Sequence, residues 1–145
     1  MAGHSVERDV DDLHELARQV FASQPFSRFM GAELTGAGPR QAEISLPIVE
    51  HLKQQHGFVH GGVISYLADN AITFAGGLAL GGDALTSEFK INYIRPAVGS
   101  RLVARAQAKA VGRRQAVCQC DIYAVEDGKE SLCAVAQGTV VPVKQ

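Results

Sequence analysis

The chain has 145 residues, 46% of them hydrophobic and 20% charged, which favours one globular domain large enough to fold alone. Its formal net charge of −1, from 14 basic and 15 acidic residues, argues against a general electrostatic attraction to nucleic acid or to anionic membranes. Residues 1–15 lack the apolar run of a secretory signal, and the odd count of 3 cysteines is typical of free thiols in a reducing compartment, so we expect a cytoplasmic protein.

The first half of the chain predicts two helices that flank a pair of strands. Apolar residues at helical spacing over residues 10–22 predict an amphipathic lead-in helix, and residues 24–31 are interpreted as an irregular connection. The segment 32–48 has the pattern of two strands joined by the turn GAGPR, and a loop follows it. Residues 61–80 are long enough for a helix of about five turns, and glycines mark its end.

The second half of the chain alternates apolar and polar residues and predicts four strands. They cover residues 84–96, 100–112, 114–126 and 130–143. Asp127-Gly128 separates the last two and is a strong hairpin signal. Cys118 and Cys120 fall two apart in a predicted strand and therefore share a face, and we interpret them as small buried hydrophobic residues.

The helix predicted over residues 61–80 lacks the charged face of an exposed helix. It must therefore be buried nearly all round, and the strands must curl around it. The expected fold class is α+β, with one sheet wrapped around one long central helix. We divide the chain into an N-terminal helix and connection, residues 1–29, and a domain of residues 30–145.

One carboxylate, Asp69, stands in the middle of this apolar helix. At about 3.6 residues per turn it shares a narrow stripe with Gly62, Ser65, Thr73 and Gly76. Burying a carboxylate without partners is costly, so it either bonds a loop or a partner subunit or performs chemistry. The two glycines at the helix start leave unpaired N–H groups that attract anions. An anion site followed two turns later by a carboxylate supplies an oxyanion hole and a base, which acyl transfer requires.

The segment GFVHGGVISYLADNA, residues 57–71, resembles the signature of hot-dog-fold acyl-CoA thioesterases of the PaaI-like, phenylacetate-pathway type. That pattern is G-x-x-HGG followed by an apolar helix carrying Asp or Glu. Residues 87–97 and 110–141 resemble the family's later strands, and the likeness covers roughly residues 30–143. It implies an antiparallel sheet around the helix, homodimers that commonly stack into homotetramers, and hydrolysis of acyl-CoA without a cofactor.

The resemblance assigns roles to residues around the helix start. Asp69 matches the catalytic acid, as a general base for water or as a nucleophile, and the sequence leaves both open. Gly61 matches the oxyanion donor through its backbone N–H. Gln54 matches an amide that helps to hold the carbonyl or the water, although a loop shift of one residue would put Gln55 there. His60 is expected to orient this loop and the thioester.

Two hydroxyl and two guanidinium groups complete the implied site. Thr73, one turn after the acid, and Ser87, on the following strand, match hydroxyls that steer the attacking water. Arg113 and Arg114 lie in a predicted turn that is near the nucleotide in the family, and we expect them to bind the CoA phosphates. In the family the oxyanion loop and the helix acid of one site come from different subunits, so a monomer would hold no complete site.

Each of these assignments has a plainer alternative. The helix-start glycines can serve tight packing, Thr73 can bond back to a carbonyl, and Ser87 can be an ordinary strand residue. The arginine pair can be a solvated hairpin tip. His51, His56 and His60 suggest a metal site, but no Asp, Glu or Cys beside them completes a ligand set, so we expect no metal.

The favoured function is hydrolysis of an aryl- or medium-chain acyl-CoA to the free acid and CoA. The alternative that stays open is a non-catalytic acyl-CoA-binding protein on the same fold. A DNA-binding regulator is disfavoured because residues 1–29 predict only one helix, and a hot-dog dehydratase because the chain lacks H-x-x-x-x-P-x-x-P-G. Four apolar residues are candidates for the acyl pocket: Phe58, Tyr66, Phe74 and Leu85.

Overall fold

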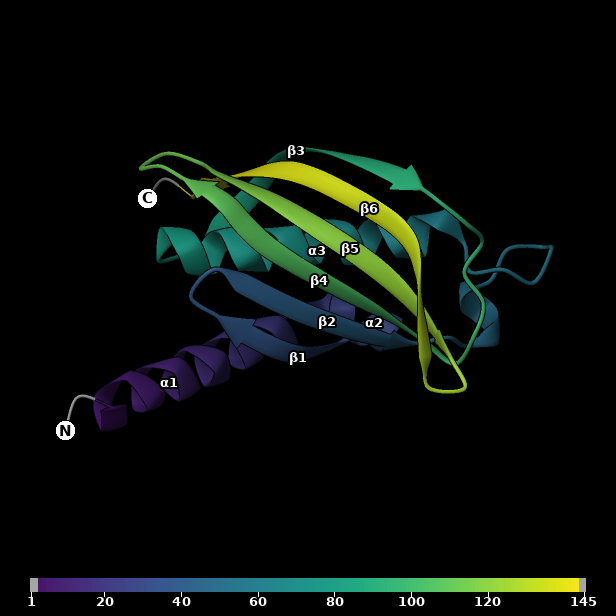
Figure 1. Cartoon of the computed structure of the whole chain (residues 1–145), viewed down its shortest axis with the longest axis horizontal. Coiled ribbons are helices and arrows are strands. Elements are labelled where there is room, and N and C mark those ends of the chain that lie inside the picture. Colours follow the sequence, from purple (N-terminus) through teal and green to yellow (C-terminus); the bar gives the residue numbers. More distant parts are fainter. Residues whose placement is uncertain (1–2, 144–145) are drawn as a thin grey trace.

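The computed structural model describes residues 3–143 and shows one curved sheet over one long helix (Figure 1). The helices are α1 (Gly3–Ala22), α2 (Pro25–Met30) and α3 (Gly61–Leu80), with a 3-10 turn at Glu50–Leu52. The strands are β1 (Glu33–Gly38), β2 (Gln41–Pro47), β3 (Ala84–Tyr93), β4 (Arg101–Val111), β5 (Ala116–Glu126) and β6 (Lys129–Pro142). The antiparallel sheet has the order β1-β2-β4-β5-β6-β3, which confirms the expected hot-dog α+β fold.

The turns predicted from glycine positions form where they were expected. Asp127 and Gly128 both have positive φ, 51° and 75°, which is the backbone of the tight hairpin turn between β5 and β6. Gly81 adopts a φ of 84° and ends α3 by donating its N–H to the carbonyl of Gly77. The predicted helix 61–80 and the four later strands are therefore confirmed.

The apolar faces of α3 meet the concave face of the sheet. Leu67, Ala71 and Ile72 are fully buried there, and the helix contacts all the strands from β2 to β6. Gly76 permits close approach to β6, since a Cβ at this position would lie 2.6 Å from the Cβ of Val140. The sequence predicts Gly76 on the polar stripe of the helix, whereas the structure packs it against the sheet.

The N-terminal segment differs from the prediction in two ways. Helix α1 begins at Gly3 and not at residue 10, and residues Pro25–Met30, predicted as irregular, form the short helix α2. Pro25 suits a first helical turn, and Gly31 ends the helix with a φ of 77°. The buried Ser27 hydroxyl also bonds the hydroxyl of Tyr66 on α3. Such a short helix depends on tertiary contacts, which explains why its sequence pattern did not reveal it.

Helix α3 is long and apolar enough, by length and composition, to cross a membrane. In the structure it lies under the sheet, and many of its side chains are buried by the strands (Figure 1). Core helices of folded domains pass the same length and composition test. We therefore interpret α3 as the core helix of this domain.

Candidate active site

The polar stripe of α3, which consists of Ser65, Asp69 and Thr73, faces the edge strand β3. The Ser65 hydroxyl lies 2.6 Å from the hydroxyl of Tyr93 at the end of β3. The Thr73 hydroxyl is hydrogen-bonded to that of Thr86 near the beginning of β3. Asp69 lies between these two contacts, at the side of the sheet where β3 has no further strand beside it.

Asp69 presents a buried carboxylate oxygen without a partner. Its Oδ1 atom is inaccessible to solvent and has no hydrogen-bond partner among the described residues. The nearby Thr73 hydroxyl donates to the backbone carbonyl of Asp69, at 2.8 Å, and not to the carboxylate. A buried acceptor left unpaired costs about 1–3 kcal/mol. Asp69 Oδ1 therefore lacks, among the described residues, the partner that a buried acceptor requires.

The first turn of α3 offers an unpaired backbone donor. His60 caps the helix, because its Nδ1 accepts the N–H of Gly62 at 2.9 Å. The N–H of Gly61 has no acceptor among residues 3–143. It points out of the positive end of the helix dipole, where an oxyanion is stabilised. Among its described contacts, the imidazole of His60 bonds this first turn of α3.

Tyr93 is a contact residue of this turn that sequence reasoning missed. Its hydroxyl donates to the carbonyl of Gly61 at 2.9 Å and also contacts Ser65. A Cβ on Gly61 would lie 3.3 Å from that hydroxyl, so the glycine leaves little spare space. The contact joins residues 32 positions apart. The local signal for it was only a tyrosine at the end of the strand that follows the helix.

Gln54 lies in the tight turn that leads to α3. Its side-chain oxygen accepts the N–H of His56, and its backbone N–H donates to Phe58 at 2.8 Å. Gln55 is exposed, whereas Gln54 is half-buried. Gln54 is therefore the glutamine that the loop holds in place, and its amide nitrogen has no acceptor among the described residues.

Gly61 and Asp69 cannot act on one thioester from within one chain. They are eight residues apart on the same helix, which separates them by about 12 Å along its axis. A donor and a base that serve the same reacting group must each lie within about 3 Å of it. The structure therefore brings Asp69 and Thr73 together and keeps Gly61 apart from them.

The two hydroxyl-bearing residues near the start of β3 have different positions. The pairing of β3 with β6 shifts between Thr86 and Glu88, which makes Ser87 the extra residue of a β-bulge. The exposed Ser87 hydroxyl donates to the carbonyl of Thr139 at 3.2 Å. Thr86, which we did not predict, is the β3 residue bonded to Thr73. The structure thus brings Thr86, and not Ser87, into contact with the α3 stripe.

Arg113 and Arg114 are exposed in the turn between β4 and β5. This turn lies at the end of the sheet where β3 begins, far from the start of α3 (Figure 1). The 20 residues of α3 separate its two ends by about 30 Å. The arginines therefore cannot serve a site built on Gly61 of their own chain.

One cavity lies beside the α3 stripe. It has a volume of about 550 Å³ and lies between α1, the second half of α3 and the start of β3. Thr73 and Phe74 line it, whereas Phe58, Tyr66 and Leu85 do not. Tyr66 instead joins a polar cluster with Ser27 and Asn70, and burial raises the pKa of its phenol.

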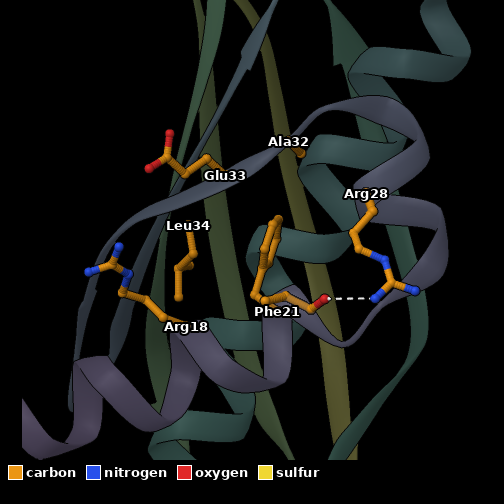
Figure 2. Close-up of a pocket in the computed structure, with 7 residues that line it drawn as sticks. Arg18, Phe21, Arg28, Ala32, Glu33 and Leu34 are labelled. Atoms are coloured by element: carbon orange, nitrogen blue, oxygen red, sulfur yellow. Dashed lines mark hydrogen bonds between the residues drawn. The ribbon is translucent and has the colours of Figure 1, made fainter.

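A smaller cavity, of about 240 Å³, lies between α1, α2 and β1 and contains no residue of α3. In Figure 2 the side chain of Arg28 points toward α1, where its guanidinium donates to the backbone carbonyl of Ala22 at 3.4 Å. Arg18 and Glu33 extend away from the aromatic ring of Phe21 in the same view. This cavity is separate from the α3 stripe. Within residues 3–143 no cluster of three metal-ligating side chains occurs at either place.

Comparison with known proteins shows the family and the fold of the chain. The family model of the thioesterase superfamily matches residues 56–131. A thioesterase family protein from Silicibacter pomeroyi is 34% identical, with a TM-score of 0.84 over 89% of this chain and 96% of its own. A thioesterase from Haemophilus influenzae is 30% identical, with a TM-score of 0.74 over 86% and 85%. The phenylacetic acid degradation protein PaaI of Thermus thermophilus is 30% identical, with a TM-score of 0.72 over 83% and 100%.

The sheet, the central helix and the HGG turn define a hot-dog protein of the PaaI-like type, as the sequence resemblance implied. The chain belongs to the thioesterase superfamily.

Proposed function

We propose that this protein, a thioester hydrolase by its family, acts on acyl-CoA at a site centred on Asp69. The observation that carries the proposal is the buried Oδ1 atom of Asp69, which has no partner among the described residues. A folded chain retains such an unpaired acceptor at a cost, which is expected where the group serves chemistry.

Asp69 would act on the thioester carbon through water or directly. As a general base it takes a proton from water, whose oxygen attacks the carbonyl carbon. As a nucleophile it forms an anhydride that water then hydrolyses. In both routes the C–S bond breaks, the CoA sulfur receives a proton, and the products are a carboxylic acid and CoA. Thr73 is proposed to steer the water from the α3 stripe. Ser87 is proposed to do so from the exposed bulge of β3, where its hydroxyl is bonded to Thr139 and not to the stripe.

The oxyanion that forms during attack would be held by the backbone N–H of Gly61. This donor has no acceptor within residues 3–143 and lies at the positive end of a helix, which favours a developing negative charge. Gln54 would add its amide, and His60 would keep the turn in place through its cap to Gly62. Gly61 and Asp69 are separated by about 12 Å along α3, at a helical rise of about 1.5 Å per residue. This separation supports a site shared between two subunits of a homodimer.

The CoA phosphates would be bound by Arg113 and Arg114, whose guanidinium groups match phosphate oxygens. Their distance from the start of α3 argues against the subunit that supplies Gly61. Assembly into a homodimer or homotetramer and a cytoplasmic location belong to the same proposal. The location is supported by the free, buried state of all three cysteines.

The proposal is tested by CoA release from aryl and straight-chain acyl-CoAs, measured with a disulfide dye for wild type and Asp69→Asn. The neutral amide keeps the shape of the side chain but neither takes a proton nor attacks carbon. We expect kcat to fall by about a thousandfold or more, within the range measured for catalytic carboxylates.

Asp121→Asn, a change of the same kind on an exposed residue of β5, serves as the matched control and should retain full activity. Retention of most activity by Asp69→Asn would show that the site lies elsewhere. Tight acyl-CoA binding without release by the wild type would establish the non-catalytic alternative.

A further inference from the structure

The cavity between α1 and α3 begins one helical turn beyond the proposed reacting group. Thr73 lines it, and the hydroxyl of Thr73 donates to the carbonyl of Asp69. One turn of helix corresponds to about 5.4 Å. A substituent that extends from a thioester carbonyl at Asp69 toward the end of α3 would therefore enter this cavity.

Helix α1 divides its apolar residues between the core and the cavity. Ala17 and Phe21 are buried, and the ring of Phe21 lies 5.5 Å from that of Phe74 on α3. Leu16 and Val20 line the cavity and stay 58% and 42% exposed. The core contacts hold α1 in position, and two large apolar side chains remain as an uncovered wall.

The side chains that line the cavity favour one chemical class of ligand. Leu13 and Leu78 add to the apolar lining, and Gln24 and Thr73 are its uncharged polar residues. Asp83 is the one ionisable side chain among the described residues that line the cavity, and it is acidic. An acyl chain that ends in a carboxylate would find no basic side chain in this lining and would be repelled by the carboxylate of Asp83. An uncharged hydrocarbon chain fits the lining, and a volume of about 550 Å³ lies within the range of ligand pockets.

We propose that this cavity receives the hydrocarbon chain of the substrate and that Leu16 and Val20 of α1 set the preferred chain length. The inference rests on the proposed acyl-CoA thioesterase activity and adds the substrate class, an unbranched, uncharged acyl group of medium length. It also gives α1 a function, as the wall of the acyl compartment.

The test compares kcat/KM for butyryl-, hexanoyl-, octanoyl- and decanoyl-CoA between wild type and Val20→Phe. For the wild type kcat/KM should rise by about fourfold for each methylene that the cavity buries. The larger ring occupies the cavity, so Val20→Phe should abolish the rise for the longer chains and leave butyryl-CoA within about twofold. Glutaryl-CoA should be a poor substrate for both proteins.

Gln19→Phe is the matched control, because it adds the same ring at the adjacent, exposed position of α1, which does not line the cavity. Its chain-length profile should match the wild type. Parallel profiles for Val20→Phe and wild type would overturn the inference while leaving the thioesterase proposal intact.

A second measurement separates the two proposals when no acyl-CoA is hydrolysed. Calorimetric titration with butyryl-CoA and decanoyl-CoA measures the affinity of the cavity for each chain without turnover. If the wild type is active, the titration uses Asp69→Asn as the parent protein. We expect the longer chain to bind more tightly to the parent protein and to lose that advantage in Val20→Phe. Equal affinities for butyryl-CoA and decanoyl-CoA in the parent protein would overturn the proposal that this cavity binds the acyl chain.

Discussion

Tyr93 connects the edge strand β3 to the first turn of α3 through one hydroxyl group. It donates to the carbonyl of Gly61 and contacts Ser65, two residues on the same face of the helix start. The proposed oxyanion donor is the N–H of that same Gly61. We therefore propose that Tyr93 is a positioning residue, which holds the first turn of α3 through the carbonyl of Gly61 and so steadies the neighbouring backbone donor.

Removal of this hydroxyl in Tyr93→Phe should loosen the helix start while keeping the ring in place. Each hydrogen bond of this kind contributes about 1 kcal/mol, so the melting temperature should fall by about 2–6 °C. A loss of about 1 kcal/mol in oxyanion positioning would lower kcat by about fivefold. Calorimetry and steady-state kinetics measure both effects.

Tyr123→Phe provides the comparison on the other face of the sheet. The ring of Tyr123 lies beneath the guanidinium of Arg105, at 5.2 Å, and its hydroxyl has no hydrogen bond among the described residues. This variant should keep both stability and kcat. If Tyr93→Phe behaved in the same way, the positioning role would be wrong.

The residues of the site differ in how far the sequence could predict them. Asp69 and Thr73 share one helix, so the helical period alone places them on one stripe, and the structure agrees. The contacts of Tyr93 and Thr86 depend on how β3 lies beside α3. The bulge at Ser87 changes which hydroxyl faces the helix, and no local pattern encodes that shift.

Among the elements, those with a strong local signal were predicted well. Helix α3 combines an unbroken apolar pattern with a glycine that ends it, and the β5–β6 hairpin has the Asp-Gly turn. Helix α2 has six residues, too few for a periodic pattern, and it depends on the contact of Ser27 with Tyr66. Elements held by tertiary contacts were therefore the ones that the sequence did not reveal.

The β4–β5 hairpin is the element whose function can be tested separately from the reaction. If Arg113 and Arg114 bind the CoA phosphates, the double variant Arg113→Ala/Arg114→Ala should raise KM for acyl-CoA by about tenfold or more, since charge-assisted bonds contribute about 1.5–3 kcal/mol. The same acyl group on pantetheine lacks the nucleotide, and its kinetics should not change.

Arg40→Ala, in the exposed turn between β1 and β2, removes the same charge elsewhere and should leave KM unchanged. An equal rise in KM for acyl-CoA and acyl-pantetheine would instead indicate a general structural effect of the hairpin. No rise with either substrate would remove both arginines from the site.

At the scale of the whole molecule, the separation of Gly61 from Asp69 predicts that activity belongs to the assembly. Mixing an inactive Gly61→Val variant with Asp69→Asn, under conditions where subunits exchange, creates heterodimers with one intact site of two. Random exchange makes half of the dimers hybrid, so activity should recover to about one quarter of the wild-type level.

Subunit exchange itself is verified by mass spectrometry of the mixed dimers. Each variant incubated alone should stay inactive under the same conditions. Hybrid dimers that form but show no activity would mean that each chain carries its own complete site, in contradiction to the distance along α3.

All three cysteines of the chain, Cys118, Cys120 and Cys133, are buried on the strands that cover α3. Burial raises the pKa of each thiol, that of Cys118 to about 11, so hardly any reactive thiolate forms near neutral pH. The proposed reaction releases CoA, a thiol that readily exchanges with disulfides. Because the three cysteine thiols are buried, the folded protein should resist forming a mixed disulfide with CoA under oxidising conditions.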